Sequence, residues 1–600
     1  MGKRTVCFYF ARTVPLGIKI VPLYGTLLKT LEKIPHMRAL LTVFLLGLCI
    51  WAQAQSNPYP QNYFRHPLNI KMELVSNFGE LRTNHWHMGL DIRTQQRENL
   101  PVYASADGYI ASVSVAAFGF GRALYINHPN GLTTVYAHMN NFEPKLHQWV
   151  IDQQYARETW EMKIDVPQEL FPVKKGDLIG YSGNTGGSQG PHVHFEIRDT
   201  RSEKCLNPLL FNFPIPDAVP PSLVRLAMYD RNKNVYAQSP QLMALKGGGM
   251  NYTLAAAPSI TVGSNRISFA LGAVDRFTGV ANPNGIYSAR IEMDGVLQSE
   301  FILDSIGYDE TRYMNAHIDY RYKAAGGAYL QHLSKLPGDR SNVYKRTPTN
   351  GVIELYDTEP HDIVITVKDA AFNTSRLQFK VQYNGALAPK AYTPAPQQLV
   401  PGEVAVFEED GFELYTMEGS VYDTVNVTFK ATPTAGAASP LFAFASHTIP
   451  VHDSVTVRIR VAEVAPEARD KIVIRNVAGT RITLQKGVWK GGWVTAKFRQ
   501  LGTFQAFVDT VPPTINAPGA GAVIDLSRAT RLVFSPKDNF KEFKNFRAEL
   551  DGQWLLFTND KGANYIYRFD KYFTPGTHTL KVSIEDEAGN VTTRSWQVRR

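Results

Sequence analysis

Two stretches determine the predicted fold of the first third of the chain. They are Asn84-His85-Trp86-His87-Met88-Gly89-Leu90-Asp91 and, about a hundred residues later, Pro191-His192-Val193-His194-Phe195-Glu196. On an extended strand His87 and Asp91 leave by the same face, because side chains alternate along a strand. His192 and His194 follow the same rule. Gly89 lies between the first pair and leaves room for a ligand. The two stretches therefore predict one site built from two strands.

The residue types in this split site are those of a metal centre. Imidazole and carboxylate groups are ligands that zinc accepts, and catalytic zinc sites use three of them and keep a fourth position for water. His85 and His87 also form a His-x-His pair, so the spacing alone leaves the register of the first stretch open between them.

Histidines are concentrated in this part of the chain. Eight of the 15 fall between positions 66 and 194, which favours a site over scattered structural histidines. Four of the eight have simpler interpretations. His85 is interpreted as a surface residue beside Trp86, His128 as a turn residue before Pro129, and His147 as a solvated loop residue, while His66 carries no usable signal.

The motifs occur in an order that resembles the zinc metallopeptidases of family M23, the lysostaphin and LytM type. They run from about residue 78 to 210 and comprise His87-x-Gly-x-Asp91, Tyr136-Ala137-His138, Lys175-Gly176, Ile179-Gly180 and Gly190-Pro191-His192-Val193-His194. The resemblance implies an antiparallel β-sheet fold with an open groove, and peptide cross-bridges of bacterial cell wall as substrate. It also selects His87 over His85.

The same resemblance implies roles for five residues. His87, Asp91 and His194 would bind one Zn²⁺ ion, and His138 and His192 would stand beside the metal-bound water and the scissile carbonyl. One imidazole can move the proton and the other can stabilise the oxyanion. Which histidine does which stays open.

Local patterns predict a few elements around the site. Residues 124–138 are typical of a hairpin whose Asn130-Gly131 pair favours a tight turn. Residues 182–190 are Gly-rich but precede a strand pattern, so we interpret them as a substrate-side loop and not as a phosphate cradle. The polar segment 143–171, with a possible helix over 151–162, is an insertion relative to the family and could form a lid or regulatory flap.

The remainder of the chain contains an internal echo. Asp217-Ala218-Val219-Pro220-Pro221 returns as Asp509-Thr510-Val511-Pro512-Pro513, and two alternating strands end in Asp369-x-Ala-x-Asn373 and Asp586-x-Ala-x-Asn590. The second pair of signals brackets a stretch the size of a small immunoglobulin-like sandwich. The first pair brackets a longer stretch, which predicts either the same unit with an insertion or two small units.

These observations predict a mainly all-β chain with an M23-like domain and about three β-sandwich modules. The expected divisions are a leader over 1–54, a peptidase domain over 55–212, an Ig-like sandwich with an insertion over 213–385, a β-sandwich of uncertain type over 386–508, and an Ig-like sandwich over 509–600.

The leader carries most of the positive charge. Seven basic residues and one acid in residues 1–54 account for +6 of the net +9, so the body is near neutral and gives little reason to bind nucleic acid. Met37-Arg38, an apolar run over 39–51 and Ala52-Gln53-Ala54 are typical of an export signal, with Met37 a candidate start. We therefore expect a periplasmic, cell-surface or extracellular protein with no stable transmembrane span after cleavage.

The sequence thus predicts an exported zinc endopeptidase acting on peptide stems and cross-bridges of peptidoglycan, with sandwich modules that position it or bind an envelope protein. Two alternatives stay open. The domain could be a non-catalytic wall-binding or activator module, although all five site residues are present, or the whole chain could be an adhesin built on its sandwich domains.

Overall fold

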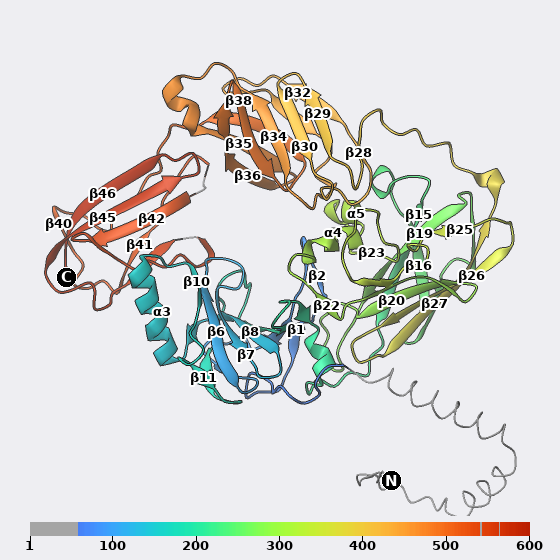
Figure 1. Cartoon of the computed structure of the whole chain (residues 1–600), viewed down its shortest axis with the longest axis horizontal. Coiled ribbons are helices and arrows are strands. Elements are labelled where there is room, and N and C mark those ends of the chain that lie inside the picture. Colours follow the sequence, from blue (N-terminus) through green and yellow to red (C-terminus); the bar gives the residue numbers. More distant parts are fainter. Residues whose placement is uncertain (1–57, 541–542, 563) are drawn as a thin grey trace, which may run out of the picture. The chain divides into compact units, whose positions relative to one another are not determined.

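The structure is a computed structural model that describes residues 58–540, 543–562 and 564–600. Figure 1 shows that strands dominate it, which confirms the predicted mainly all-β class. Residues 61–600 form one compact unit. The predicted export signal lies outside the described residues. Within the described ranges, none of the helices has the length and apolar character needed to cross a bilayer.

The first region is built on an antiparallel sheet. Along its main path the strands are β1 (Leu74–Ser76), β4 (Leu90–Arg93), β13 (His192–Asp199), β8 (Leu132–Met139), β7 (Arg122–Asn127), β6 (Gly108–Val115) and β10 (Met162–Asp165). A smaller sheet has the order β5 (Pro101–Tyr103), β12 (Leu178–Tyr181) and β9 (Asn141–Phe142), and β2 (Leu81–Arg82) pairs with β3 (His85–Trp86). β11 (Pro172–Val173) pairs with β6.

The central strand β8 is buried along seven of its eight residues, which fits its place between β13 and β7. The predicted hairpin is confirmed, since β7 and β8 are antiparallel neighbours and Gly131 in the turn has a φ of 79°. Only a residue tolerant of the left-handed region suits that position.

The predicted helix exists, but its predicted bounds were wrong. It is α3 (Pro144–Arg157), and it begins where the Glu143 carboxylate accepts hydrogen bonds from the backbone N–H groups of Lys145 and Leu146. Proline at the first helical position supports that start. Met162, expected at the helix end, opens β10 instead. The cap, and not the Gln-rich stretch, fixes where this helix begins.

The second region is a twelve-stranded sheet system. Its strands are β15 (Ser222–Asp230), β16 (Gln241–Gly248), β17 (Asn251–Leu254), β18 (Ser259–Val262), β19 (Arg266–Val274), β20 (Ser288–Met293), β21 (Val296–Ile302), β23 (Gln331–His332), β24 (Tyr344–Arg346), β25 (Ile353–Glu354), β26 (Pro360–Lys368) and β27 (Thr374–Tyr383). Short helices α4 (Met314–His317) and α5 (Tyr320–Ala324) interrupt it between β21 and β23.

The first and second regions share structure across residue 212. β14 (Cys205–Leu206) pairs with β13 on one side and with β22 (Ser305–Ile306) of the second region on the other. Trp86 is fully buried and its ring lies 5.5 Å from that of His317. The boundary at 212/213 stays a prediction, and the hydrogen bonding of the sheet crosses it.

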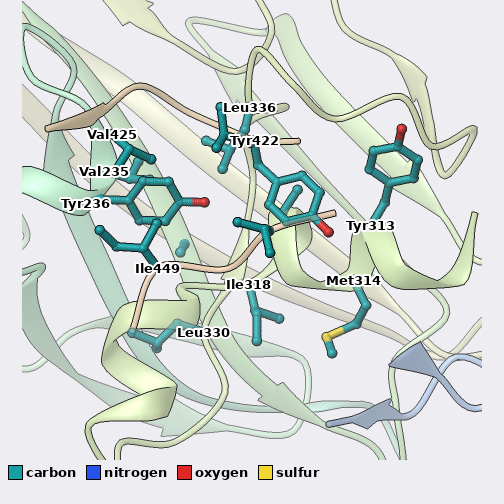
Figure 2. Packing of buried hydrophobic residues seen from close by; sticks show 14 of the residues in the cluster. Val235, Tyr236, Tyr313, Met314, Ile318, Leu330, Leu336, Tyr422, Val425 and Ile449 are labelled. Atoms are coloured by element: carbon teal, nitrogen blue, oxygen red, sulfur yellow. The ribbon is translucent and has the colours of Figure 1, made fainter. Parts of the chain in front are cut away.

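The third region contains two five-stranded sheets. One consists of β29 (Ala405–Glu409), β30 (Phe412–Thr416), β34 (Val455–Arg460), β38 (Trp493–Phe498) and β37 (Val488–Lys490), and the other of β32 (Phe429–Thr432), β33 (Leu441–Phe444), β39 (Gly502–Val508), β35 (Ile472–Ala478) and β36 (Arg481–Lys486). Figure 2 shows Tyr422 and Ile449 of this region packed among Tyr313, Ile318 and Leu330 of the second. Their apolar side chains form one continuous core.

The last region has a five-stranded and a two-stranded sheet. The larger contains β40 (Val523–Asp525), β46 (Val591–Arg599), β45 (Thr577–Asp586), β42 (Phe543–Leu550) and β43 (Gln553–Trp554), and the smaller pairs β41 (Arg531–Phe534) with β44 (Tyr565–Arg568). Phe534 and Tyr567 from the smaller sheet share a core with Leu580 and Val582 from the larger. The two sheets therefore enclose one core, as a sandwich does.

Candidate metal and catalytic site

Pairing of β4 with β13 builds the centre of the site. In this antiparallel register His194 lies directly opposite Asp91. The sequence pattern placed His87 and Asp91 on one strand, and this prediction is wrong. β3 ends at Trp86 and β4 begins at Leu90, so His87 lies between the two strands. The chain bends between them and returns the imidazole over Asp91. The two residues therefore meet through a bend and not through strand alternation.

Gly89 in this bend serves a different purpose from the one expected. A Cβ atom there would lie 2.4 Å from the backbone oxygen of Phe195 and 3.1 Å from Cε1 of His194. The space beside the glycine is filled by β13 and not by a ligand. Any larger residue would push the two ligand-bearing segments apart.

The three proposed ligand atoms converge in a buried triangle. His87 Nε2 lies 2.9 Å from Asp91 Oδ1 and 3.0 Å from His194 Nδ1, and His194 Nδ1 lies 2.9 Å from Asp91 Oδ1. A tetrahedral zinc ion with bonds of about 2.0–2.1 Å holds its ligand atoms roughly 3.3 Å apart. The donor types and their separations therefore fit a zinc ion. Burial lowers the pKa of His87 to about 4, whereas Asp91 and Glu196 outweigh burial and raise the pKa of His194 to about 9, so a metal ion would have to displace a proton from His194.

Each histidine ligand is oriented by a hydrogen bond from its second nitrogen. His87 Nδ1 lies 2.7 Å from the backbone oxygen of Asn77, and His194 Nε2 lies 3.0 Å from Glu196 Oε1. Such contacts fix the tautomer and the ring orientation of a metal ligand. Arg82 positions the carboxylate of Asp91, because its Nη2 donates a hydrogen bond to Asp91 Oδ2 over 2.5 Å.

Glu196 is a functional residue that sequence reasoning missed. It is fully buried and accepts hydrogen bonds from Arg198 Nε and from the Tyr308 hydroxyl as well as facing His194. Burial alone would raise its pKa, but Arg198 and His194 outweigh burial and lower the pKa to about 2. The carboxylate is therefore charged. Period-two alternation, His192-x-His194-x-Glu196, was the signal that could have found it.

His138 lies near the end of β8 in a strained backbone conformation. Its φ is 58°, in the left-handed region that non-glycine residues seldom adopt. Its Nδ1 lies 2.8 Å from the backbone oxygen of Thr185, so Nδ1 carries the proton and Nε2 is left as an acceptor. Burial, with the neighbouring His192, lowers the pKa of His138 to about 3. Strain of this kind is characteristic of functional sites.

His192 stands beside His138 on the first residue of β13. The two ring centroids are 4.7 Å apart, and His192 Nε2 lies 3.4 Å from Asp91 Oδ1. That nitrogen is buried and has no hydrogen-bond partner, while Nδ1 lies 2.8 Å from the Gly190 backbone oxygen. A buried polar atom without a partner carries a free-energy cost, so its placement next to the ligand triangle indicates a ligand or substrate partner.

The other four histidines of the cluster lie apart from this group. His85 is exposed and bonds the Thr83 backbone oxygen, and His66 bonds the Ile70 backbone oxygen. His128 is buried between the Asp107 backbone oxygen and the Thr134 hydroxyl, so it supports the hairpin from inside. The sequence analysis expected His147 in a solvated loop, but it lies half-buried on α3.

The insertion 143–171 contacts the last region. Tyr155 of α3 stacks on Tyr572 at 3.8 Å and donates its hydroxyl hydrogen to Asp570 over 2.8 Å. From the same region, Asp560 Oδ1 accepts from the Gly186 N–H, and Lys561 Nζ donates to the Ser188 backbone oxygen. The loop 182–190 provides backbone oxygens that contact His138 and His192, and residues near the C-terminal end of the chain contact this loop.

A buried carboxylate and two imidazoles converge on one point, with two further imidazoles beside them, which is an arrangement able to bind a metal ion and to transfer protons. Comparison with known proteins agrees with this interpretation. Residues 85–155 and 163–208 match the model of peptidase family M23, so the chain carries a peptidase M23 domain. Residues 397–509 match a Zu5-like domain, which gives a type to the sandwich predicted over 386–508.

Two curated relatives are each similar to about a quarter of this chain. The DD-carboxypeptidase/endopeptidase Mpg of Neisseria meningitidis is 31% identical over 26% of this chain and 27% of its own length. The peptidoglycan DD-endopeptidase ShyA of Vibrio cholerae is 27% identical over 26% of this chain and 31% of its own length. The chain thus spans less than a third of the length of these two relatives.

Among solved structures, the catalytic domain of lysostaphin from Staphylococcus simulans aligns at 23% identity. The alignment covers 24% of this chain and 92% of that domain, with a TM-score of 0.18.

Proposed function

We propose that this protein is an exported zinc endopeptidase that hydrolyses peptide cross-links of bacterial peptidoglycan. The observation that carries the proposal is the convergence of His87, Asp91 and His194 on one point with His138 and His192 beside it. The printed names of the relatives, a carboxypeptidase/endopeptidase and a peptidoglycan endopeptidase, support the substrate class. An envelope location follows from that substrate and from the expected export signal.

In this mechanism His87, Asp91 and His194 would hold the zinc ion. When bound, zinc supplies Lewis acidity, which polarises the scissile carbonyl and lowers the pKa of water toward about 7. His138 is neutral and presents Nε2 as an acceptor, because its Nδ1–H is given to Thr185. It can therefore take a proton from the attacking water and return it to the leaving amine.

His192 is held in the same way as His138, with Nδ1 on a backbone oxygen and Nε2 facing the site. Its Nδ1 contacts Gly190 and its unpartnered Nε2 is buried next to Asp91. In one assignment His138 moves the proton and His192, protonated on Nε2, stabilises the oxyanion; exchange of the two roles is the second assignment. Both assignments use the Nε2 atoms of two imidazole rings whose centroids lie 4.7 Å apart.

The proposal is tested by His194→Ala in the full chain. We expect the variant to bind no zinc by metal analysis and to release no fragments from purified sacculi, because it removes one of three ligands. His85→Ala is the matched control: that histidine is exposed and two residues from a ligand, so zinc content and activity should stay at the wild-type level. Fragment release by His194→Ala that equals wild type would refute the assignment.

The same experiment decides the non-catalytic alternative. A wall-binding or activator module would bind sacculi without releasing fragments, in wild type as in the variant. Mass spectrometry of the products from defined muropeptides would identify both the bond and the substrate if wild type is active.

A further inference from the structure

Three carboxylates meet in the second region, far along the chain from the catalytic histidines. Asp217, Asp275 and Asp369 each present an oxygen, and these oxygens all lie within 4.8 Å of one another. Asp217 lies in the segment that leads into β15, Asp275 directly follows β19, and Asp369 directly follows β26. Like charges at this spacing repel, so the fold must hold them together for a reason.

Backbone turns hold two of the three in place. Asp369 Oδ1 accepts from the Asn373 N–H, and its Oδ2 accepts from the Asn373 side-chain amide, both over 2.8 Å. The same amide donates to the backbone oxygen of Asp217, whose Oδ1 accepts from the Val219 N–H. The Asp-x-Ala-x-Asn motif therefore joins the end of β26 to the start of the region.

The third carboxylate lacks the partners that the other two have. Asp275 is 2% exposed, yet its Oδ1 has no hydrogen-bond partner. The neighbouring Arg276 directs its guanidinium to the Ala281 backbone oxygen and the Ser222 hydroxyl. A buried carboxylate oxygen without a hydrogen-bond partner, in a group with two other carboxylates, has the surroundings of a cation ligand.

The last region repeats this arrangement. Asp509, Asp538 and Asp586 bring oxygens within 4.8 Å of one another, and Oδ1 of the partly buried Asp538 is covered and has no hydrogen-bond partner. Asp586 accepts from Asn590 through both oxygens over 2.8 Å, and the Asn590 amide donates to the Asp509 backbone oxygen. Asp275-Arg276-Phe277 and Asp538-Asn539-Phe540 are thus a third echo in the sequence, beside the two noted above.

We propose that each of the two aspartate clusters binds one calcium ion. All the candidate ligands are carboxylate oxygens, which suit hard cations and not zinc. Calcium takes oxygen ligands at 2.3–2.6 Å in irregular geometry, so its ligands can stand up to roughly 4.6–5.2 Å apart, which accommodates the separations found. Magnesium demands a more regular and tighter octahedron.

The clusters stand where regions join. Asp217 comes a few residues after the peptidase strands, and Asp509 directly follows β39, the last strand of the Zu5-like region. Each ion would tie the incoming segment to the strand ends of the sandwich that follows. Calcium would then stiffen the junctions at Asp217 and Asp509, and this effect would not depend on peptidase activity.

Calcium titration of the full chain, loaded with one zinc ion and freed of calcium, tests the proposal. Isothermal calorimetry should give two calcium ions per chain, and calcium should raise the melting temperature. Asp275→Asn and Asp538→Asn should each bind one ion, and the double variant none. Asp410→Asn is the control, because Asp410 is an exposed residue paired only with Arg460 on the surface; it should still bind two.

The variants also separate a lost ligand from a lost fold. Without calcium, Asp275→Asn should melt at the wild-type temperature or above it, because the substitution removes repulsion. With calcium, the same variant should melt below wild type. Absence of calcium binding at millimolar concentration, retention of two ions by the double variant, or equal affinity for magnesium would overturn the proposal.

Discussion

The histidine site of the peptidase region and the aspartate clusters of the two sandwich regions are both groups of side chains that could hold a metal ion, but they differ in ligand type and in surroundings. The peptidase site combines imidazole and carboxylate groups, and two further histidines face the space beside it. The aspartate clusters contain only carboxylates, fixed by turns of their own backbone. The first arrangement places further histidines beside its ligand atoms, and the second would surround an ion with carboxylates alone. The difference teaches that ligand type and surroundings together distinguish catalysis from stabilisation.

The strongest way to break this comparison is selective removal of zinc. 1,10-Phenanthroline prefers soft and borderline metals to calcium, so we expect complete loss of fragment release from sacculi while the two calcium ions stay bound. Restored activity on addition of zinc, but not of calcium, would complete the contrast. Activity that survives zinc removal, confirmed by metal analysis, would place the chemistry elsewhere.

Removing a proton-transfer group without removing a ligand separates the two functions inside the histidine site. His138→Ala should lower kcat by about 10²–10⁴-fold, the usual contribution of general acid–base catalysis, and should retain one zinc ion per chain. Steady-state cleavage of a soluble muropeptide and metal analysis provide the two measurements. Loss of zinc in this variant would show that His138 is a ligand.

Glu196→Gln sharpens the comparison through the group that orients His194. Loss of the charge should weaken zinc affinity about 10–100-fold, the usual effect of altering a residue that positions a metal ligand. Competition with a zinc-binding dye measures it. Tyr308→Phe is the control, since it removes one hydrogen bond to Glu196 but keeps the carboxylate. Its cost is about 1 kcal/mol of unfolding free energy. An unchanged zinc affinity in Glu196→Gln would argue that Glu196 serves only the core.

The smallest expected effect comes from the contact between the last region and the loop 182–190. Asp560→Ala removes the acceptor of the Gly186 N–H, a bond worth about 1 kcal/mol. Looser positioning of Thr185, and through it of His138, should lower kcat by at most about fivefold. Ser188→Ala in the same loop would test the matching contact to His192. A rise in activity in Asp560→Ala would instead identify this contact as an inhibitory plug.

The sequence by itself determined the mainly all-β class, the hairpin at Asn130-Gly131, and the five residues that the structure brings together. It could do so because strand periodicity and turn chemistry are local, and because the order of the motifs is specific. The same locality explains the errors. The start of α3 depends on the cap at Glu143, and the path of His87 depends on a bend that periodicity does not report.

Only the tertiary structure decided what lies around those residues. Glu196 and Arg82 act on the ligand triangle through contacts that the sequence does not order, and Tyr308 reaches Glu196 from 112 positions away. The three aspartates of each cluster come from separate strand ends, and their repeated motifs gave no sign that they converge. The physical reason is the same in each case. The type of each side chain is given by the sequence, but its burial, its hydrogen-bond partners and the charges around it depend on strands that the fold brings together.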